Sequence, residues 1–222
     1  SNQSCPWRML VESNKVDDRG ASFLSYLHDH VPPFLSSIVT ELKSQHGIDA
    51  LIFHADHVCY RTESIEEYTA LLTALQSSNA EFSLLIESEI GGRQIATFKL
   101  TTPICYTLEN GIYRSIDVIE IPSPKEGSAY KAGLEHVEFV VKDEAGGRIS
   151  SPRNDETHQN ALNRWMEKYP SVSWNTKALS KECNPDISTK MELDVYGTIS
   201  IKFHLMPLED IIKFELKRVE NA

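Results

Sequence analysis

The sequence predicts an α+β fold in which two β-α-β-β-β modules form a curved, barrel-like mixed sheet with helices outside. One observation is that the same order of strand and helix patterns occurs twice along the chain. The tripeptides around His57 and His136 also match in pattern, and the last strand of each copy ends in a polar residue, Glu120 and then His204. One module alone would leave an apolar sheet face and strand edges exposed, so two copies are expected to cover each other.

The N-terminal part is predicted to be a helical extension packed on these modules. Residues 20–46 carry apolar side chains at helical spacing. Pro32 and Pro33 are expected to end a first helix, after which a second runs to Gly47.

The expected organisation is one compact domain with four parts. In order these are a poorly ordered tail over 1–16, the helical extension over 17–50, the first module over 51–125, and the second module with a C-terminal helix over 130–216.

The first module begins with a strand whose side chains alternate over residues 56–61. Ser64 and Glu67 then have the spacing of a capping box, which predicts a helix continuing to Leu75. Three strands complete the module, over residues 82–89, 94–100 and 115–121.

The second module repeats this order with different loops. A strand over 135–141 is followed by a polar loop over 143–155 and a helix over 156–169. The remaining predicted elements are strands over 176–182, 188–195 and 198–205, and a short helix over about 207–216.

Composition excludes several classes of partner. The formal net charge is -10, and no run of Lys and Arg exceeds a pair, so a nucleic-acid partner is not expected. No apolar stretch reaches the roughly 18–20 residues that a membrane helix needs, so no membrane partner is expected. The cysteines are far apart and include no CxxC pair, as expected for reduced thiols in a cytoplasmic protein.

Strand alternation groups the polar residues of these strands on shared faces. His57 shares a face with Arg61, and His136 with Glu138, while Lys202 and His204 share a face of the last strand. Together with Glu120, the three histidines His57, His136 and His204 form a candidate ligand set for one divalent ion of Fe, Mn, Co, Ni or Zn.

Four segments carry a resemblance to a known family: DHVCYRT, RSIDVIEIPSP, GLEHVEFVV and GTISIKFHLMPLEDII. They resemble the bacterial YecM family, and through it the vicinal oxygen chelate superfamily of glyoxalases and extradiol dioxygenases. The resemblance covers about residues 20–215 and implies metal ligands at His57, Glu120, His136 and His204. The chain departs from the glyoxalase pattern at His204, where that pattern has Glu. The resemblance implies lyase, isomerase or dioxygenase chemistry on a small oxygen-rich substrate.

The other polar residues on these faces have two interpretations each. Glu138 is a candidate general base, or else a cavity-wall carboxylate bonded to Arg61 or Lys202. Arg61 and Lys202 are candidates for binding an anionic group of the substrate, or they neutralise acidic neighbours. Asp56 and Glu135 are expected to point outward into solvent.

Two function classes remain open from the sequence. One is a metal-dependent enzyme with a small-molecule substrate. The other is a metal-free module that binds a small ligand on the same fold. Both are compatible with a monomer or a homodimer. An interaction role for the N-terminal helices is a third interpretation, although core packing explains their amphipathic pattern equally well.

Overall fold

The computed structural model describes residues 16–221 except 79, 109–110, 128, 130, 143–148 and 150. The tail predicted over 1–16 therefore lies, apart from Val16, outside the described residues. The chain divides into two compact units, each built from two segments. The first unit comprises Ser1–Phe34 and Val58–Glu135, and the second comprises Leu35–His57 and His136–Ala222.

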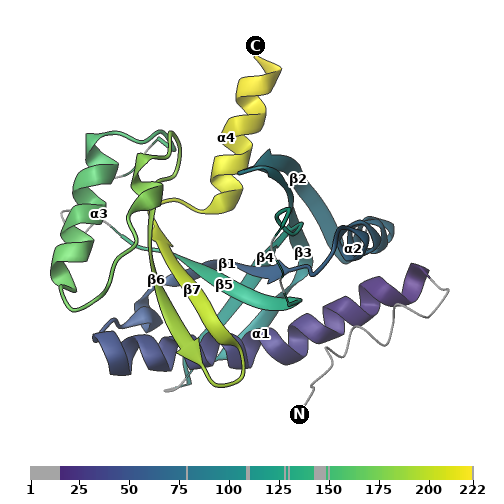
Figure 1. Ribbon diagram of the computed structural model, residues 1–222, viewed down its shortest axis with the longest axis horizontal. Coiled ribbons are helices and arrows are strands. Elements are labelled where there is room, and N and C mark those ends of the chain that lie inside the picture. Colours follow the sequence, from purple (N-terminus) through teal and green to yellow (C-terminus); the bar gives the residue numbers. More distant parts are fainter. Residues whose placement is uncertain are drawn as a thin grey trace. The chain divides into compact units, whose positions relative to one another are not determined.

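The described residues form four α-helices, two short 3-10 helices and seven strands, a mixed α+β fold (Figure 1). In chain order the elements are α1 (Val16–His46), η2 (Ala50–Ile52), β1 (His54–Arg61), α2 (Ile65–Ser77), β2 (Phe82–Ile90), β3 (Arg93–Thr107), β4 (Tyr113–Pro122), β5 (Gly133–Val140), α3 (Glu156–Lys168), η4 (Lys177–Ser180), β6 (Asp186–Leu193), β7 (Gly197–His204) and α4 (Leu208–Glu220).

The chain has the element order β-α-β-β-β from β1 to β4, and the part of β1 from Val58 onward belongs to the first unit, whose strands are hydrogen-bonded in the order β2-β3-β4-β1. The pairs β2–β3 and β3–β4 are antiparallel, and β4–β1 is parallel. Helix α2 begins as predicted, because Oγ of Ser64 accepts a hydrogen bond from the backbone N–H of Glu67 at 3.0 Å. The carboxylate of Glu67 accepts from the N–H of Glu63, so only half of the capping box forms.

Aromatic side chains fill the core of the first unit. The ring of Phe23 on α1 meets the ring of Tyr60 on β1 edge-on, with centroids 5.0 Å apart. Phe82 and Phe98 form a second edge-on pair between β2 and β3. All four side chains are buried, so this half of α1 is held against the strands by apolar burial.

The second unit has one strand fewer than its predicted module within the described residues. Its elements from β5 follow the order β-α-β-β, with β5 parallel to β7, and with β6 and β7 forming an antiparallel hairpin (Figure 1). Strand β1 neighbours β5 on the other side. Phe203 on β7 is fully buried and contacts the rings of Phe139, Trp165 and Trp174, which make the core of this unit.

The strand predicted over 176–182 is wrong, because the 3-10 helix η4 occupies this segment. The side chain of Asn175 accepts a hydrogen bond from the N–H of Lys177, which turns the backbone at the start of the segment. The side chain of Asn154 donates to the carbonyls of Leu179 and Lys181, which a strand ladder would otherwise use. Side-chain hydrogen bonds thus replace the expected sheet pairing.

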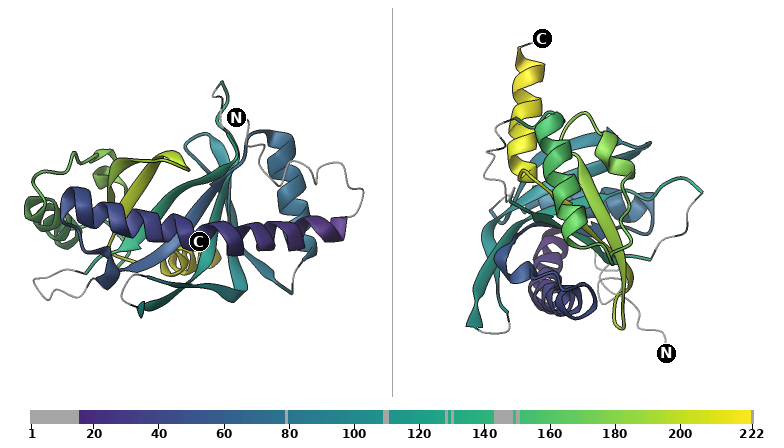
Figure 2. Two further views of the ribbon diagram at one scale, coloured as in Figure 1. Left: turned by 90° about the horizontal axis from the view of Figure 1, so that it is seen from below. Right: turned by 90° about the vertical axis from the view of Figure 1, so that its left-hand side faces the viewer.

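The helix break predicted at Pro32 and Pro33 is also wrong. Figure 2 shows α1 as one uninterrupted helix, and both prolines lie inside it. The buried side chains keep their helical spacing across the two prolines, since buried Val31 is followed four residues later by buried Leu35. Burial of these side chains therefore outweighs the local cost of a proline in a helix, which is on the order of 3 kcal/mol.

The barrel-like closure predicted for the sheet is not found. Within the described residues, β2 pairs with β3 and β6 pairs with β7, and the outer side of β6 has only an isolated bridge between Ser188 and Asn175, so the two end strands do not pair with each other. The replacement of a predicted strand by η4 removes one element from which a closed sheet would be built.

Among the described helices, none combines the length and the apolar character needed to cross a bilayer.

Candidate functional site

Two histidines of the second unit turn their rings toward one carboxylate. His57 on β1 and His136 on β5 are buried, and their ring centroids lie 6.2 Å apart. Oε1 of Glu138 lies 3.5 Å from Nε2 of His57 and 3.6 Å from Nε2 of His136. A ring nitrogen of each histidine lies within 4.8 Å of one on the other. The repeated strand motif therefore brings two imidazoles to a common carboxylate.

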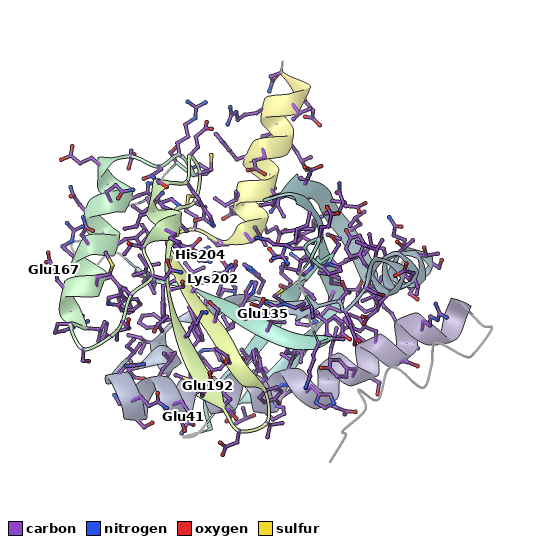
Figure 3. The ribbon with its side chains drawn as sticks, in the orientation of Figure 1. Glu41, Glu135, Glu167, Glu192, Lys202 and His204 are labelled. Atoms are coloured by element: carbon purple, nitrogen blue, oxygen red, sulfur yellow. The ribbon has the colours of Figure 1, made fainter. Side chains whose placement is uncertain are left out.

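Lys202 on β7 is bonded to the same carboxylate. Its Nζ lies 2.7 Å from Oε1 of Glu138 and 3.4 Å from Nε2 of His136. This contact follows from the sheet, because Glu138 on β5 and Lys202 on β7 are register partners. Figure 3 labels Lys202 and His204 close together on β7. Of the partners that the sequence left open for Glu138, the structure shows an ion pair with Lys202.

Asp56 is buried, so the prediction that it points into solvent was wrong. Its Oδ2 accepts hydrogen bonds from Nδ1 of His57 and from the backbone N–H of Leu208, each at 2.9 Å. The prediction assumed that one face of β1 is exposed to solvent, but six consecutive residues from Ala55 to Tyr60 are buried. When both faces of a strand are covered, alternation no longer separates buried from solvated side chains.

His204, at the end of β7, contacts protein groups through both ring nitrogens. Nδ1 lies 2.9 Å from Nδ2 of Asn184 and 3.4 Å from Oε2 of Glu138. Nε2 lies 3.4 Å from Oδ2 of Asp56. Its ring centroid is 6.0 Å from that of His57, so His204 belongs to the same buried network of the second unit.

Asn184 was missed by the sequence analysis. It is the one non-glycine residue with positive φ in the described part of the chain, at 44°. Asn tolerates this left-handed backbone conformation better than most residues. The Asn-Pro dipeptide at this position marks a turn and was the available signal.

Opposite charges hold this network in its ionised form. Burial raises the pKa of Glu138, but the charges of Lys202 and His57 hold that pKa well below its usual range. Burial likewise raises the pKa of Asp56, but hydrogen bonds from His204 and His57 hold it below its usual range. Burial lowers the pKa of His57, whereas Glu138 and Asp56 together raise it to about 10.

The other predicted site residues belong to the first unit. Glu120 on β4 is the register partner of Cys59 on β1. Arg61 lies at the end of β1, and its Nη2 is 2.5 Å from Oε1 of Glu135. Glu135, predicted to be solvated, is therefore ion-paired and half-buried.

The donor set of the second unit fits a metal ion chemically. Imidazole nitrogens and carboxylate oxygens are ligands that suit divalent first-row metals, and buried examples of both are close together here. The hydrogen bond from Nδ1 of His57 to Asp56 is also the arrangement common behind metal-bound histidines. Buried His and Glu side chains could therefore bind a metal ion, and this ligand chemistry does not select one metal.

Comparison with solved structures gives one match that supports the fold and two that are more distant. A protein described as "Structural Genomics, Protein EC4020" is 22% identical, with a TM-score of 0.57 over 96% of this chain and 98% of that chain. Hydroxyglutarate synthase from Oryza sativa in complex with 2-oxoadipate is 13% identical, with a TM-score of 0.40 over 86% of this chain and 82% of its own. A triple mutant of 4-hydroxymandelate synthase from Streptomyces coelicolor is 15% identical, with a TM-score of 0.33 over 68% of this chain and 48% of its own.

No curated protein matches the chain. The model of one protein family, described as YecM protein, matches residues 24–215. This match includes every element from β1 to β7 and all the residues of the buried network. The chain therefore belongs to the YecM protein family.

Proposed function

We propose that this protein is a divalent-metal-dependent enzyme of the vicinal oxygen chelate type that acts on a small oxygen-rich substrate. The reaction would be of the lyase, isomerase or dioxygenase kind. The observation that carries the proposal is the convergence of Nε2 of His57 and Nε2 of His136 on one carboxylate oxygen in a buried network. A buried imidazole pair with a carboxylate is costly to maintain unless it binds something or is fully paired.

The proposed protein ligands are His57, His136 and Glu120. Support for Glu120 comes from the first unit, where it is the parallel register partner of Cys59. Cys59 lies two residues after His57 on β1, so the two share a face of that strand. The side chain of Glu120 is expected on the same face, because register partners in a sheet point to the same side. Two imidazoles and one carboxylate would leave positions open for substrate oxygens.

A bound divalent ion would polarise substrate oxygens and stabilise the negative charge that develops on them. Glu138 would supply the protein's own proton chemistry, because its Oε1 faces both histidines and its carboxylate is ionised. An anionic group of the substrate would be held by Lys202. This substrate group would compete with Glu138 for the ammonium of Lys202. The carboxylate of Glu138 would then be released to accept a proton. Arg61 is proposed for the same binding role, in competition with Glu135.

The test is metal analysis of the full chain purified from metal-supplemented cells. We expect about one divalent ion per chain in the wild type and strong loss in His57→Ala, His136→Ala and Glu120→Ala. His158→Gln is the matched control, because His158 is a buried histidine on α3 whose ring is bonded to Asp155. A wild-type protein without stoichiometric metal would end the proposal.

A metal-free ligand-binding module is the second candidate. It is favoured by the position of Lys202, whose Nζ lies 2.7 Å from Oε1 of Glu138 and 3.4 Å from Nε2 of His136. The positive charge of this ammonium group therefore already lies beside both groups. Thermal unfolding against a panel of divalent metals, with and without EDTA, separates the two. A metal that binds the native state raises the unfolding temperature by mass action, whereas a flat response across the panel favours the metal-free module.

A further inference from the structure

The buried aspartate at the start of β1 is held from three directions. Oδ2 of Asp56 accepts from Nδ1 of His57 and from the N–H of Leu208, and Nε2 of His204 lies 3.4 Å away. The first of these groups belongs to β1, the second to α4 and the third to the end of β7. A carboxylate with partners on three elements has little rotational freedom, so it can fix the ring that bonds to it.

His57 is the ring that this carboxylate orients. Its Nδ1 is engaged by Asp56, whereas its Nε2 faces Oε1 of Glu138 beside Nε2 of His136. A proton held on Nδ1 by a carboxylate leaves Nε2 as the nitrogen that can coordinate. Asp56 thus selects which nitrogen of His57 faces the candidate metal site.

His204 has a different environment from His57 and His136. Both of its ring nitrogens face protein groups, Nδ1 toward Asn184 and Glu138 and Nε2 toward Asp56. To coordinate a metal, His204 would have to give up contacts on one side of its buried ring. Coordination through Nδ1 would break its hydrogen bond with Asn184 and leave a buried polar group without that partner, whereas Nε2 makes no hydrogen bond among the described residues and coordination through it would give up the ion-pair contact that holds Asp56.

We propose that His204 is a positioning residue and not a metal ligand. It holds Asp56, and Asp56 holds His57 so that Nε2 is presented to the metal. This inference rests on the proposed function, and it divides the predicted set of three histidines into two ligands and one support. Asn184 completes the chain of contacts behind His204, held at a backbone conformation that few residue types adopt.

The test is a count of coordinated imidazoles in the full chain. Protein labelled with nitrogen-15 histidine and loaded with cadmium-113 shows a direct cadmium–nitrogen coupling for each bound ring. We expect coupling on His57 and His136 and none on His204, whose signal is assigned by its absence from His204→Gln. Coupling on all three rings overturns this inference and leaves the proposed function standing. Absence of coupling on His57 and His136 overturns the proposed function and this inference with it.

A pair of variants separates positioning from ligation by affinity. His204→Gln keeps an N–H donor for Asp56, whereas His204→Leu keeps the bulk and removes the donor. We expect zinc affinity to stay within about threefold of wild type in the Gln variant and to fall about tenfold to a hundredfold in the Leu variant. His158→Gln is the control and should leave zinc affinity unchanged. Equal losses in the two His204 variants would overturn the inference.

Discussion

Nδ1 of His57 donates a hydrogen bond to Oδ2 of Asp56 at 2.9 Å, between two consecutive residues of one buried strand. The bond joins a proposed metal ligand to a residue that strand alternation alone would place in solvent. It therefore gives a direct way to test whether the buried network serves metal binding.

Replacing Asp56 by Asn should weaken metal binding. The amide is a poorer acceptor and carries no charge, so it holds the ring of His57 less firmly. We expect zinc affinity to fall about tenfold to a hundredfold, measured by competition with a chromophoric chelator. Asp155→Asn is the matched control, because Asp155 also bonds a buried histidine, His158 on α3. Equal affinity of Asp56→Asn and wild type would contradict the role of Asp56.

Metal binding should release a proton from His57. The carboxylates of Glu138 and Asp56 raise the pKa of His57 to about 10, so its ring is protonated at neutral pH. A coordinating imidazole must give up one proton, and metal affinity should therefore increase with pH up to that value. Calorimetric titration with zinc near neutral pH, in buffers of different ionisation enthalpy, should show about one proton released per metal. Zero release would mean that His57 is already neutral or does not bind.

The metal-free protein should be most stable in mildly acidic solution. The pKa of His57 is raised from 6.5, so its contribution to stability is complete below 6.5 and is lost as the pH rises toward about 10. The pKa of Glu138 is lowered from 4.5, so its contribution is present above 4.5 and is lost as the pH falls further. We expect the largest contribution of these groups to the free energy of unfolding between these two values.

Urea unfolding in the presence of a chelator checks this pH dependence. The free energy of unfolding of the wild type should decline from pH 6 to pH 9, and the decline should be smaller in His57→Gln. The same slope in both proteins would assign the effect to other groups.

The ion pair of Lys202 and Glu138 should be costly to break from one side. Removing the ammonium in Lys202→Met leaves a buried carboxylate without its closest cation. We expect a loss of about 3 kcal/mol in the free energy of unfolding, measured in urea with chelator present. Adding Glu138→Gln in the same chain removes the unpaired carboxylate charge and should recover most of the lost free energy of unfolding. If the double variant is as unstable as the sum of the two single variants, the pair is not coupled.

Gly20 should be required by the packing of α1 against the end of α2. A Cβ built at Gly20 would lie 2.1 Å from Oγ and 2.9 Å from Cβ of Ser78, closer than atoms can approach. Gly20→Ala is therefore expected to destabilise the protein by about 1–3 kcal/mol, although Ala favours a helix. In a Ser78→Gly background, most of this loss should disappear, because the close contact that remains is with the carbonyl oxygen of Ala74 at 3.3 Å. The measurement is the thermal unfolding of the wild type, Gly20→Ala, Ser78→Gly and the double variant.

The sequence alone predicted the elements whose signals are local. The cap at Ser64, the strand patterns around His57 and His136, and the helix predicted over 156–169, which ends at Lys168 in the structure, depend on residues close together in the chain. The failures were also predictions from local sequence: two prolines were expected to break α1, and a strand was expected over 176–182, where η4 occurs. In each case contacts with distant residues outweighed the local preference.

What the sequence determined by itself is which residue types lie at the ends and on the faces of the strands, because side-chain alternation is a property of the backbone. That alternation was enough to group His136 with Glu138 on one face of a strand and Lys202 with His204 on one face of another. Only the tertiary structure decided that Asp56 is buried, since the N–H that it binds belongs to Leu208, 152 residues later. It likewise decided that His204 faces Asp56 and Asn184. Which groups meet a buried side chain depends on the elements that cover its strand, and no local pattern carries that information.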